Sequence, residues 1–184
     1  MTNKESIIRA EETADIPTIW QVNEAAFGRA AEANLVDALR QGNGIVASLV
    51  AVCQQKIVGH KKIVGHKKIV GHILFSPMTA DEPTGQPVRI VALGPMAVHP
   101  DYQGLGIGSQ LVRAGIDHCR QAGVDLMIVL GHSWFYPRFG FTPAAPHGMR
   151  AQWDVADEVF MVKELRSGAL SQVKGMVRYR PEFG

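Results

Sequence analysis

The amino-acid sequence predicts an α+β fold built on a mixed sheet. Short apolar runs of strand length alternate with stretches in which apolar residues recur at helical spacing. Turns rich in glycine and proline separate these elements. The predicted order is β-α-α-β-β-β-α-β-α-β, with six to seven strands in all and about four helices. This uneven mixture of strands and helices is typical of the α+β class.

A single domain is expected over residues 1–184. The chain is 46% hydrophobic and long enough to bury one core. Its formal net charge of +2 is too small to indicate a nucleic-acid partner. The N-terminus has no signal-peptide run, and no stretch is apolar over the roughly 18 residues that a membrane span needs. We therefore expect a cytoplasmic protein without a membrane partner, in which Cys53 and Cys119 stay reduced.

The first part of the chain predicts one strand and two helices. Ser6–Ala10 has the composition of a strand. Asp15 and Pro17 favour the start of a helix that runs to Phe27. Helical spacing resumes between Glu32 and Leu39, and a glycine-rich turn ends this second helix. Two helices therefore precede the next strand.

A repeated hexad follows the second predicted strand, at residues 45–53. Lys56–His60 is followed by two full copies, Lys61–His66 and Lys67–His72. If a single copy is kept, the chain has the pattern of an ordinary hairpin into the third strand. We interpret the repeat, at about residues 56–72, as an insertion that lengthens this hairpin without touching the active site.

The repeat leaves two alternatives to a simple duplication. His60, His66 and His72 suggest a metal site, but six residues along a strand span about 20 Å, which is too far for one coordination sphere. We therefore expect no metal. The two extra copies also carry four lysines, which would suit a polybasic contact with anionic lipid or nucleic acid.

The central stretch of the chain predicts a strand, a glycine corner and a helix. Val91–Val98 is an apolar strand, and Pro100 and Asp101 make a turn after it. The glycine-rich segment Gly104–Gly108 then leads into a helix with apolar spacing as far as Cys119. The first backbone N–H groups of such a helix are free to bind an anion such as a phosphate.

Two other interpretations of the glycine corner remain open. The first is a nicotinamide dinucleotide site, which needs its first glycine directly after the strand and a glycine at position 109. In this chain several residues separate the strand from Gly104, and position 109 is a serine. Asp125 lies about 20 residues farther on, as a ribose-binding acid would, but it opens a strand. The second alternative is a purely structural turn that binds no ligand.

The last part of the chain predicts three more strands and a short helix. Residues 125–130 have the pattern of a parallel strand that is buried on both faces. A short helix is expected over 134–138, and another strand over 158–165. Residues 175–179 form an edge strand or a covering arm, and an exposed edge would allow a homodimer.

The glycine corner resembles a signature of the GNAT superfamily of N-acetyltransferases. Pro100–Gly108 is similar to its Gln/Arg-x-x-Gly-x-Gly/Ala motif, and Tyr136–Phe141 resembles its tyrosine-to-Gly-Phe segment. Ala26–Arg29, Gly71–Ser76 and the tail Phe160–Tyr179 resemble one bacterial branch of predicted acetyltransferases. The resemblance spans nearly the whole chain except the duplicated hexads. It implies that the mixed sheet is mostly antiparallel.

The resemblance also implies acetyl-CoA as the acetyl donor. Backbone N–H groups from Gly104 to Ser109 would bind the pyrophosphate, with no Cβ to block the approach. The strand Met96–Val98 would pair with the pantetheine arm, and the sheet would open near Gly94–Met96, where an unpaired N–H would stabilise the oxyanion. The expected cofactor-binding residues are Met96, Ala97, Val98, Gln103, Gly104, Leu105, Gly106, Ile107, Gly108 and Ser109.

The predicted reaction is direct attack of a primary amine on the thioester carbonyl. By resemblance, Tyr136 is the catalytic acid that protonates the departing thiolate, and its alternative role is that of a core aromatic residue. The acceptor is a small-molecule or peptide amine, and its predicted contacts are Phe27, Glu32 and His132. The resemblance implies that residues 27–39 and the tail wall its pocket. His132 stands where the resemblance implies an acidic residue.

The general base stays open among several groups. The alternatives are water and five side chains, namely Glu24, Glu32, His72, His99 and His132. Because the residues alone identify no base, a second function stays open beside the enzyme. This alternative is a coenzyme A-binding regulatory or interaction domain with little catalysis.

Overall fold

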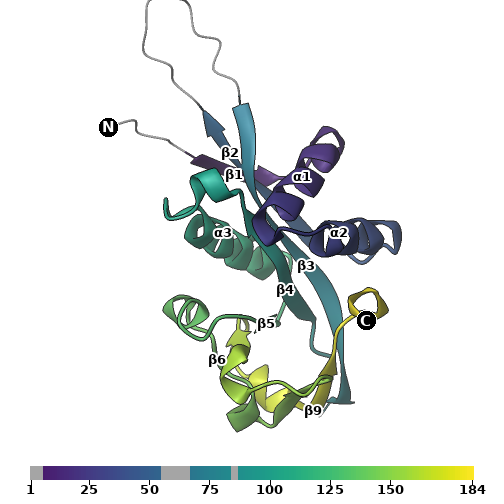
Figure 1. Ribbon diagram of the computed structural model, residues 1–184. Coiled ribbons are helices and arrows are strands. Elements are labelled where there is room, and N and C mark those ends of the chain that lie inside the picture. The colour runs from purple at the N-terminus through teal and green to yellow at the C-terminus, as the bar shows by residue number, and fades with distance from the viewer. Residues whose placement is uncertain (1–5, 55–66, 84–86) are drawn as a thin grey trace, which may run out of the picture.

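The computed structural model describes residues 6–54, 67–83 and 87–184, and this part of the chain contains nine strands and three α-helices (Figure 1). The α-helices are α1 Ile16–Phe27, α2 Ala31–Gln41 and α3 Ile107–Gln121. The strands are β1 Ser6–Ala10, β2 Ala47–Gln54, β3 Lys67–Pro83, β4 Ile90–Val98, β5 Leu126–Leu130, β6 Thr142–Pro143, β7 Met149–Ala151, β8 Phe160–Glu164 and β9 Val173–Arg178.

The sheet is mixed and mostly antiparallel, which confirms the predicted fold class. Its main path runs β1-β2-β3-β4-β5-β8-β6, while β9 pairs with both β3 and β7. Only β4 with β5 and β7 with β9 are parallel among the described pairs. The strand count exceeds the prediction because β6 and β7 are too short to give a periodic signal. The expected fourth helix is a 3-10 helix, Tyr136–Phe139, with Pro137 at its start and Gly140 at its end.

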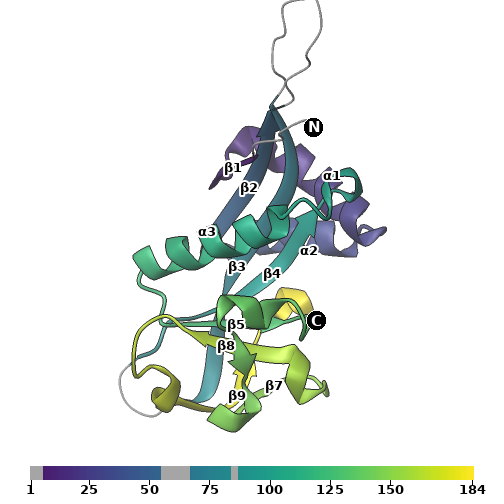
Figure 2. The ribbon, with the colours of Figure 1, turned by 90° about the vertical axis from the view of Figure 1, so that its left-hand side faces the viewer.

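Helices cover both faces of the sheet, with α1 and α2 on one face and α3 on the other (Figures 1 and 2). Alternate side chains of β2 point to opposite faces of the sheet. Leu49 and Ala51 pack in the cluster that includes α3, whereas Val50 and Val52 pack in the cluster that includes α1 and α2. This period of two is the side-chain alternation of a strand. The third described cluster joins β5, β8 and β9 in the C-terminal half.

Helix α3 packs closely on the sheet at a glycine. A Cβ at Gly115 would lie 2.2 Å from Cζ of Phe75 on β3, so only glycine leaves room for that ring. Phe75 is fully buried, and so are Leu111 and Val112 on the helix. This contact fixes the height of α3 above the sheet and therefore the position of its N-terminus.

The hexad repeat is described only in part. Residues 55–66 lie outside the described residues, so the predicted insertion is not tested there. The last copy, Lys67–His72, forms the start of β3, where His72 pairs with Val50 of β2. His72 is fully buried, and its ring nitrogens lie 3.0 Å from Nδ2 of Asn23 and 2.9 Å from Oγ of Ser48. This histidine is therefore a core residue.

The sheet opens between β4 and β5, as expected. Their parallel pairing covers only Ile90–Ala92 against Leu126–Ile128, although β4 continues to Val98. On the other side of β4, the register with β3 shifts between its pairs at Leu93 and Met96. Gly94 lies in this bulge with φ of 144°, a value that favours glycine. Beyond Ala92, β4 therefore has an edge that faces a gap.

Candidate active site

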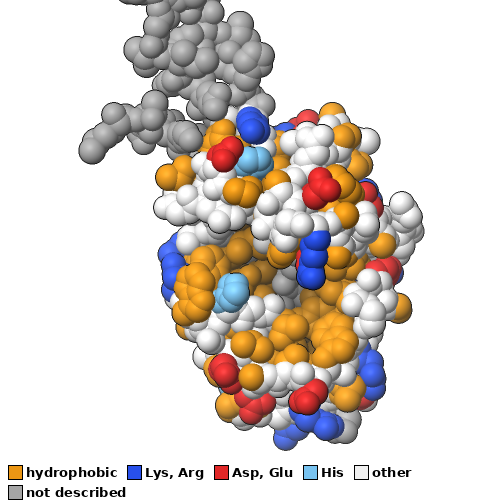
Figure 3. Space-filling model, in the orientation of Figure 1, with side chains coloured by type: hydrophobic (Ala, Val, Ile, Leu, Met, Phe, Trp, Pro, Cys, Tyr) orange, Lys and Arg blue, Asp and Glu red, His pale blue; other side chains and the backbone are white. Residues whose placement is uncertain are grey.

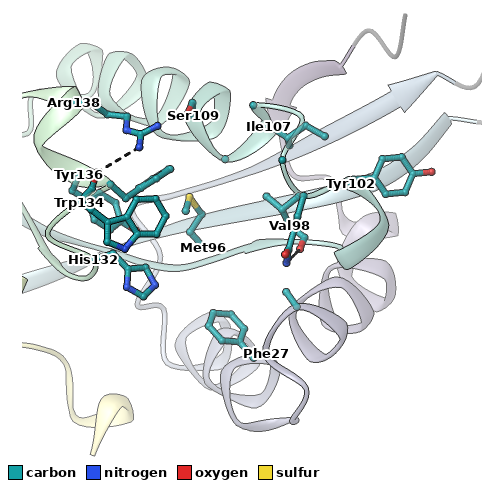
Figure 4. Close-up of a pocket in the computed structure, with 16 residues that line it drawn as sticks. Phe27, Met96, Val98, Tyr102, Ile107, Ser109, His132, Trp134, Tyr136 and Arg138 are labelled. Atoms are coloured by element: carbon teal, nitrogen blue, oxygen red, sulfur yellow. Dashed lines mark hydrogen bonds between the residues drawn. The ribbon is translucent and has the colours of Figure 1, made fainter. Parts of the chain in front are cut away.

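Two cavities meet where β4 and β5 separate. The larger cavity has a volume of about 530 Å³ and lies between the N-terminus of α3, β4 and the segment from His132 to Arg138 (Figure 4). The smaller cavity has a volume of about 380 Å³ and lies between the start of α2, β4 and the C-terminal tail. Four residues line both cavities, namely Phe27, Met96, His132 and Tyr136.

The glycine corner builds one wall of the larger cavity. Gly104 and Gly106 have φ of 73° and 79°, in the left-handed region that other residues rarely adopt. A Cβ at either position would meet no atom within 4 Å, so the backbone faces open space. Gly106 is the N-cap of α3, and the first N–H groups of a helix have no acceptor within it. The corner therefore presents free donors and the positive end of the helix dipole to the cavity.

The structure brings together eight of the ten predicted cofactor-binding residues. The larger cavity is lined by Met96, Val98, Gln103, Gly104, Gly106, Ile107, Gly108 and Ser109. Ala97 points to the opposite face of β4 and is buried in the cluster with α1 and α2. Leu105 has an exposed side chain that does not line the cavity. The prediction that Ala97 and Leu105 bind the cofactor is therefore limited to their backbone groups.

Tyr136 lies at the junction of the two cavities. Its side chain is 6% exposed and packs edge-on against the rings of Phe135 and Phe141. A Cβ at Gly131 would lie 2.3 Å from Cε2 of Tyr136, so the ring rests directly on that glycine. Burial raises the pKa of Tyr136 to about 12, because the charged phenolate would lose its hydration. The hydroxyl therefore keeps its proton at neutral pH.

The three predicted acceptor contacts line the smaller cavity. Phe27 ends α1, and Glu32 lies in the first turn of α2. Arg29 donates hydrogen bonds to the Glu32 carboxylate from Nε and Nη2, which holds the pKa of Glu32 below its usual value. His132 stacks on Trp134, with ring centroids 5.4 Å apart. A charged carboxylate and an imidazole therefore stand near Tyr136.

Three of the five side chains considered as a general base lie outside both cavities. Glu24 is exposed on α1, and His72 is buried in the core. Nδ1 of His99 accepts a hydrogen bond of 3.3 Å from the backbone N–H of Asp101. Glu32 and His132 are the two candidates that reach the cavities.

Several cavity residues were not predicted from the sequence. The larger cavity also contains Trp134, Phe135 and Arg138, whose guanidinium lies 4.8 Å from the centre of the Phe135 ring. These residues flank Tyr136 in the sequence, so the aromatic run itself was a usable signal. The smaller cavity also contains Trp153 and Phe183, which the sequence places far from any motif. Tyr179, which lines it too, belongs to the tail that was expected as a wall of the acceptor pocket.

Other predicted features have structural roles. Asp125 accepts hydrogen bonds from the backbone N–H of Arg89 and from Nε of Arg166, away from both cavities. Cys53 and Cys119 are both buried, and no disulfide joins them. Within residues 6–54, 67–83 and 87–184, no three His, Cys, Asp or Glu side chains gather as a metal site. In the same ranges, no helix is long and apolar enough to cross a membrane.

Comparison with known proteins identifies the family. A family model described as an acetyltransferase (GNAT) domain matches residues 47–143, which include β4, the glycine corner and Tyr136. The chain belongs to the GNAT acetyltransferases. Family membership confirms the resemblance and makes this protein an acyltransferase, in place of the dinucleotide and structural-turn alternatives.

This acetyltransferase has similar relatives in bacteria. It is 32% identical to the uncharacterized N-acetyltransferase YhbS of Escherichia coli strain K12, over 96% of this chain and 98% of that protein. A crystal structure of E. coli YhbS in complex with CoA superposes with a TM-score of 0.84, over 100% of this chain and 94% of that one. A GNAT acetyltransferase from Brucella melitensis, in complex with acetyl-CoA, is 30% identical with a TM-score of 0.73, over 99% and 100% of the two chains.

Proposed function

We propose that this acetyltransferase transfers the acetyl group of acetyl-CoA to a primary amine by direct attack. In this proposal the larger cavity holds the cofactor and the smaller cavity holds the acceptor. The observation that carries it is the position of Tyr136, whose ring lines both cavities at the point where they meet. The CoA and acetyl-CoA complexes of the two relatives support the choice of donor.

The residues of the larger cavity fit a coenzyme A molecule. The N–H groups of Gly104 to Ser109 suit the pyrophosphate, because they combine free donors with the positive end of α3. A Cβ at Gly108 would lie 3.7 to 3.8 Å from Met96, Val98 and Phe135, so its absence keeps that part of the cavity open. The free edge of β4 beyond Ala92 suits the amide groups of the pantetheine arm, which would add to it as a strand does.

The reaction needs two proton transfers, one to the departing thiolate and one from the acceptor amine. Acetyl-CoA supplies the activated acyl group as a thioester. When the amine nitrogen bonds to the carbonyl carbon and the C–S bond breaks, the Tyr136 hydroxyl donates its proton to the sulfur and regains one from solvent. Backbone N–H groups at the opening near Gly94–Met96 stabilise the charge on the carbonyl oxygen.

The acceptor amine must also lose a proton. An alkylamine has a pKa near 10.4 and is mostly protonated at neutral pH. Glu32 and His132 are the side chains of the smaller cavity that can take this proton, either directly or through water. Each is placed by a different element, α2 or the loop after β5, so the two roles are separable by mutation.

Tyr136→Phe tests the proposal because it removes the hydroxyl and keeps the ring. We expect kcat for thiol release from acetyl-CoA, with an amine acceptor, to fall about 100-fold or more, as loss of a general acid does. The pH dependence of kcat should also change. Thermal stabilisation by coenzyme A should be retained, because the larger cavity keeps its shape.

Tyr102→Phe is the matched control. Tyr102 lines the larger cavity but not the smaller one, so its hydroxyl is away from the junction. This variant should keep its kcat. Full turnover of Tyr136→Phe with an unchanged pH profile would contradict the acid role. Stabilisation of the unmodified protein by coenzyme A without turnover of any amine would instead favour a binding or regulatory domain.

A further inference from the structure

We propose that the acceptor is a small primary amine carried on a compact apolar body, recognised by aromatic walls and a single carboxylate in the smaller cavity. This inference rests on the proposed function, since it assigns the smaller cavity to the acceptor. It goes further by naming the chemical class of the amine.

The walls of the smaller cavity are mostly apolar. Leu35, Leu93 and Leu130 line it together with the aromatic side chains of Phe27, Trp153 and Phe183. In the orientation of Figure 3, hydrophobic side chains gather around a hollow in the middle of the molecule. Polar acceptors would lose water there and find few hydrogen-bonding partners in return. An apolar body is therefore the better occupant.

Two large apolar side chains of this cavity are exposed to solvent. Phe27 is 41% exposed and Leu130 is 40% exposed, and both border the smaller cavity. Exposed apolar groups around a concavity indicate a surface that a ligand covers. An apolar acceptor body would cover both side chains, whereas a hydrophilic chain would leave them wet.

An aromatic column lines the smaller cavity. The ring centroid of Tyr179 lies 5.0 Å from that of Trp153 and 4.9 Å from that of Phe183. The Tyr179 side chain is only 9% exposed, and the contact of its hydroxyl with the backbone of Leu130 falls short of hydrogen-bond geometry in the described part of the chain. Buried hydroxyls are usually paired, so this one points to a ligand group.

Tyr179 lines the same cavity as Tyr136. Burial raises the pKa of Tyr179, and the Tyr136 side chain adds to this rise while a contact with the backbone of Leu130 opposes it. The two tyrosines therefore border one acceptor cavity. An amine N–H can donate to the Tyr179 oxygen there, which orients the nitrogen towards the thioester.

Charge in the smaller cavity selects an acceptor with one cationic group. Glu32 is the only acidic or basic residue among the described lining residues apart from His132. Its side chain is 16% exposed, while that of its partner Arg29 is 69% exposed and free to move aside. A carboxylate has about four acceptor positions, so it can also bind an ammonium group. A second ammonium or a carboxylate on the acceptor would find no opposite charge.

The test compares four amines at saturating acetyl-CoA, with initial rates of thiol release as the readout. The probes are 2-phenylethylamine, ethanolamine, spermidine and phenylalanine. We expect kcat/KM for 2-phenylethylamine to exceed that of each other amine at least tenfold. Ethanolamine lacks the apolar body, and phenylalanine keeps it and adds a carboxylate. Spermidine lacks the ring and also adds cationic groups, so it tests both features together.

Two variants connect this preference to the smaller cavity. Tyr179→Phe should raise KM for 2-phenylethylamine about three- to tenfold, while KM for acetyl-CoA and the thermal midpoint stay unchanged. Leu130→Ser should reduce the preference for 2-phenylethylamine over ethanolamine. Ile7→Ser is the matched control, because Ile7 is exposed on β1 and lines neither cavity.

The outcomes separate this inference from the proposed function. Equal or better turnover of ethanolamine or spermidine would overturn the apolar acceptor and leave acetyl transfer standing. An unchanged KM for 2-phenylethylamine in Tyr179→Phe would overturn the role of that hydroxyl. If no amine releases thiol while coenzyme A still stabilises the protein, acetyl transfer itself is wrong and the acceptor class falls with it.

Discussion

Gly131 determines where the ring of Tyr136 can lie. A Cβ at this position would come within 2.3 Å of Cε2 and 2.9 Å of Cδ2, both in a buried ring that cannot move freely. In Gly131→Ala we expect the ring to shift and kcat to fall at least tenfold, because a general acid acts only within hydrogen-bond reach. Steady-state kinetics together with coenzyme A binding measure this effect.

Gly108→Ala is the contrasting substitution at the same site. Its Cβ would make ordinary contacts of 3.7 to 3.8 Å, so Tyr136 should keep its place. We expect KM for acetyl-CoA to rise in this variant with little change in kcat. A Gly131→Ala enzyme with normal kcat would show that the position of the Tyr136 ring does not limit the reaction.

Among single site residues, the sequence predicted the ones that belong to local motifs. Tyr136 and the glycine corner follow from local patterns, and both line the expected cavity. The tail was expected to wall the acceptor pocket, but Tyr179 itself was not singled out, because its place depends on the pairing of β9 with β3, about 95 residues earlier in the chain. Residues brought together by such long-range pairing leave no local signal.

His72 links β3 to its neighbours through a chain of buried hydrogen bonds. Nδ2 of Asn23 donates to one ring nitrogen, so the other ring nitrogen donates to Oγ of Ser48, which in turn donates to the carboxylate of Glu11. Arg40 pairs with that carboxylate at 3.1 Å. Burial lowers the pKa of His72 to about 4, which the charge of Glu11 opposes. The neutral imidazole is therefore part of the folded core.

The stability of the fold should consequently fall in mild acid. In the unfolded chain His72 titrates near 6.5, so between pH 6.5 and pH 4 the unfolded state binds more protons than the folded state. The free energy of unfolding should drop through this window by up to about 3 kcal/mol. Urea unfolding at several pH values measures the drop. His72→Gln should flatten the slope, whereas the same change at the exposed His118 should not.

The elements themselves were predicted better than their lengths. The bounds of β1 and α1 agree closely with the pattern, because a strand run and a capped, amphipathic helix are strong signals. The length of β3 was underestimated, since the repeat hides its start and it continues past Pro77 to pair with β9. The two full copies, Lys61–His66 and Lys67–His72, have the same sequence, so only the residues that follow each copy distinguish them.

At the scale of the whole molecule, the site lies where the sheet divides. Strands β1 to β4 form one half with α1, α2 and α3, and β5 to β9 form most of the other, as Figure 2 shows. Two pairings join the halves, namely the short parallel ladder between β4 and β5 and the antiparallel pairing of β9 with the end of β3. Both cavities form at this division, which explains why they draw on nearly every part of the chain.

The buried residues of β3 determine which copy of the hexad repeat forms the strand. The last copy supplies the start of β3, and only this copy is followed by the apolar residues Ile73, Leu74 and Phe75, all fully buried. A shift of the strand by one copy would place Lys67 and Lys68 at two of these buried positions, at a high cost in desolvation. We propose that the other copies are an insertion that the fold does not need.

Deletion of Lys61–His72 tests this proposal on the complete protein. The remaining copy, Lys56–His60, would then run directly into Ile73 and restore the same sequence before it. We expect the shortened protein to keep its kcat/KM within about twofold, since none of the described residues of the repeat, 67–72, lines either cavity. In the shortened protein His60 should take the place of His72 beside Asn23. His60→Leu should therefore destabilise the shortened protein and leave the full-length protein unchanged, as measured by thermal unfolding. Loss of activity in a folded deletion variant would show that the repeat serves the site.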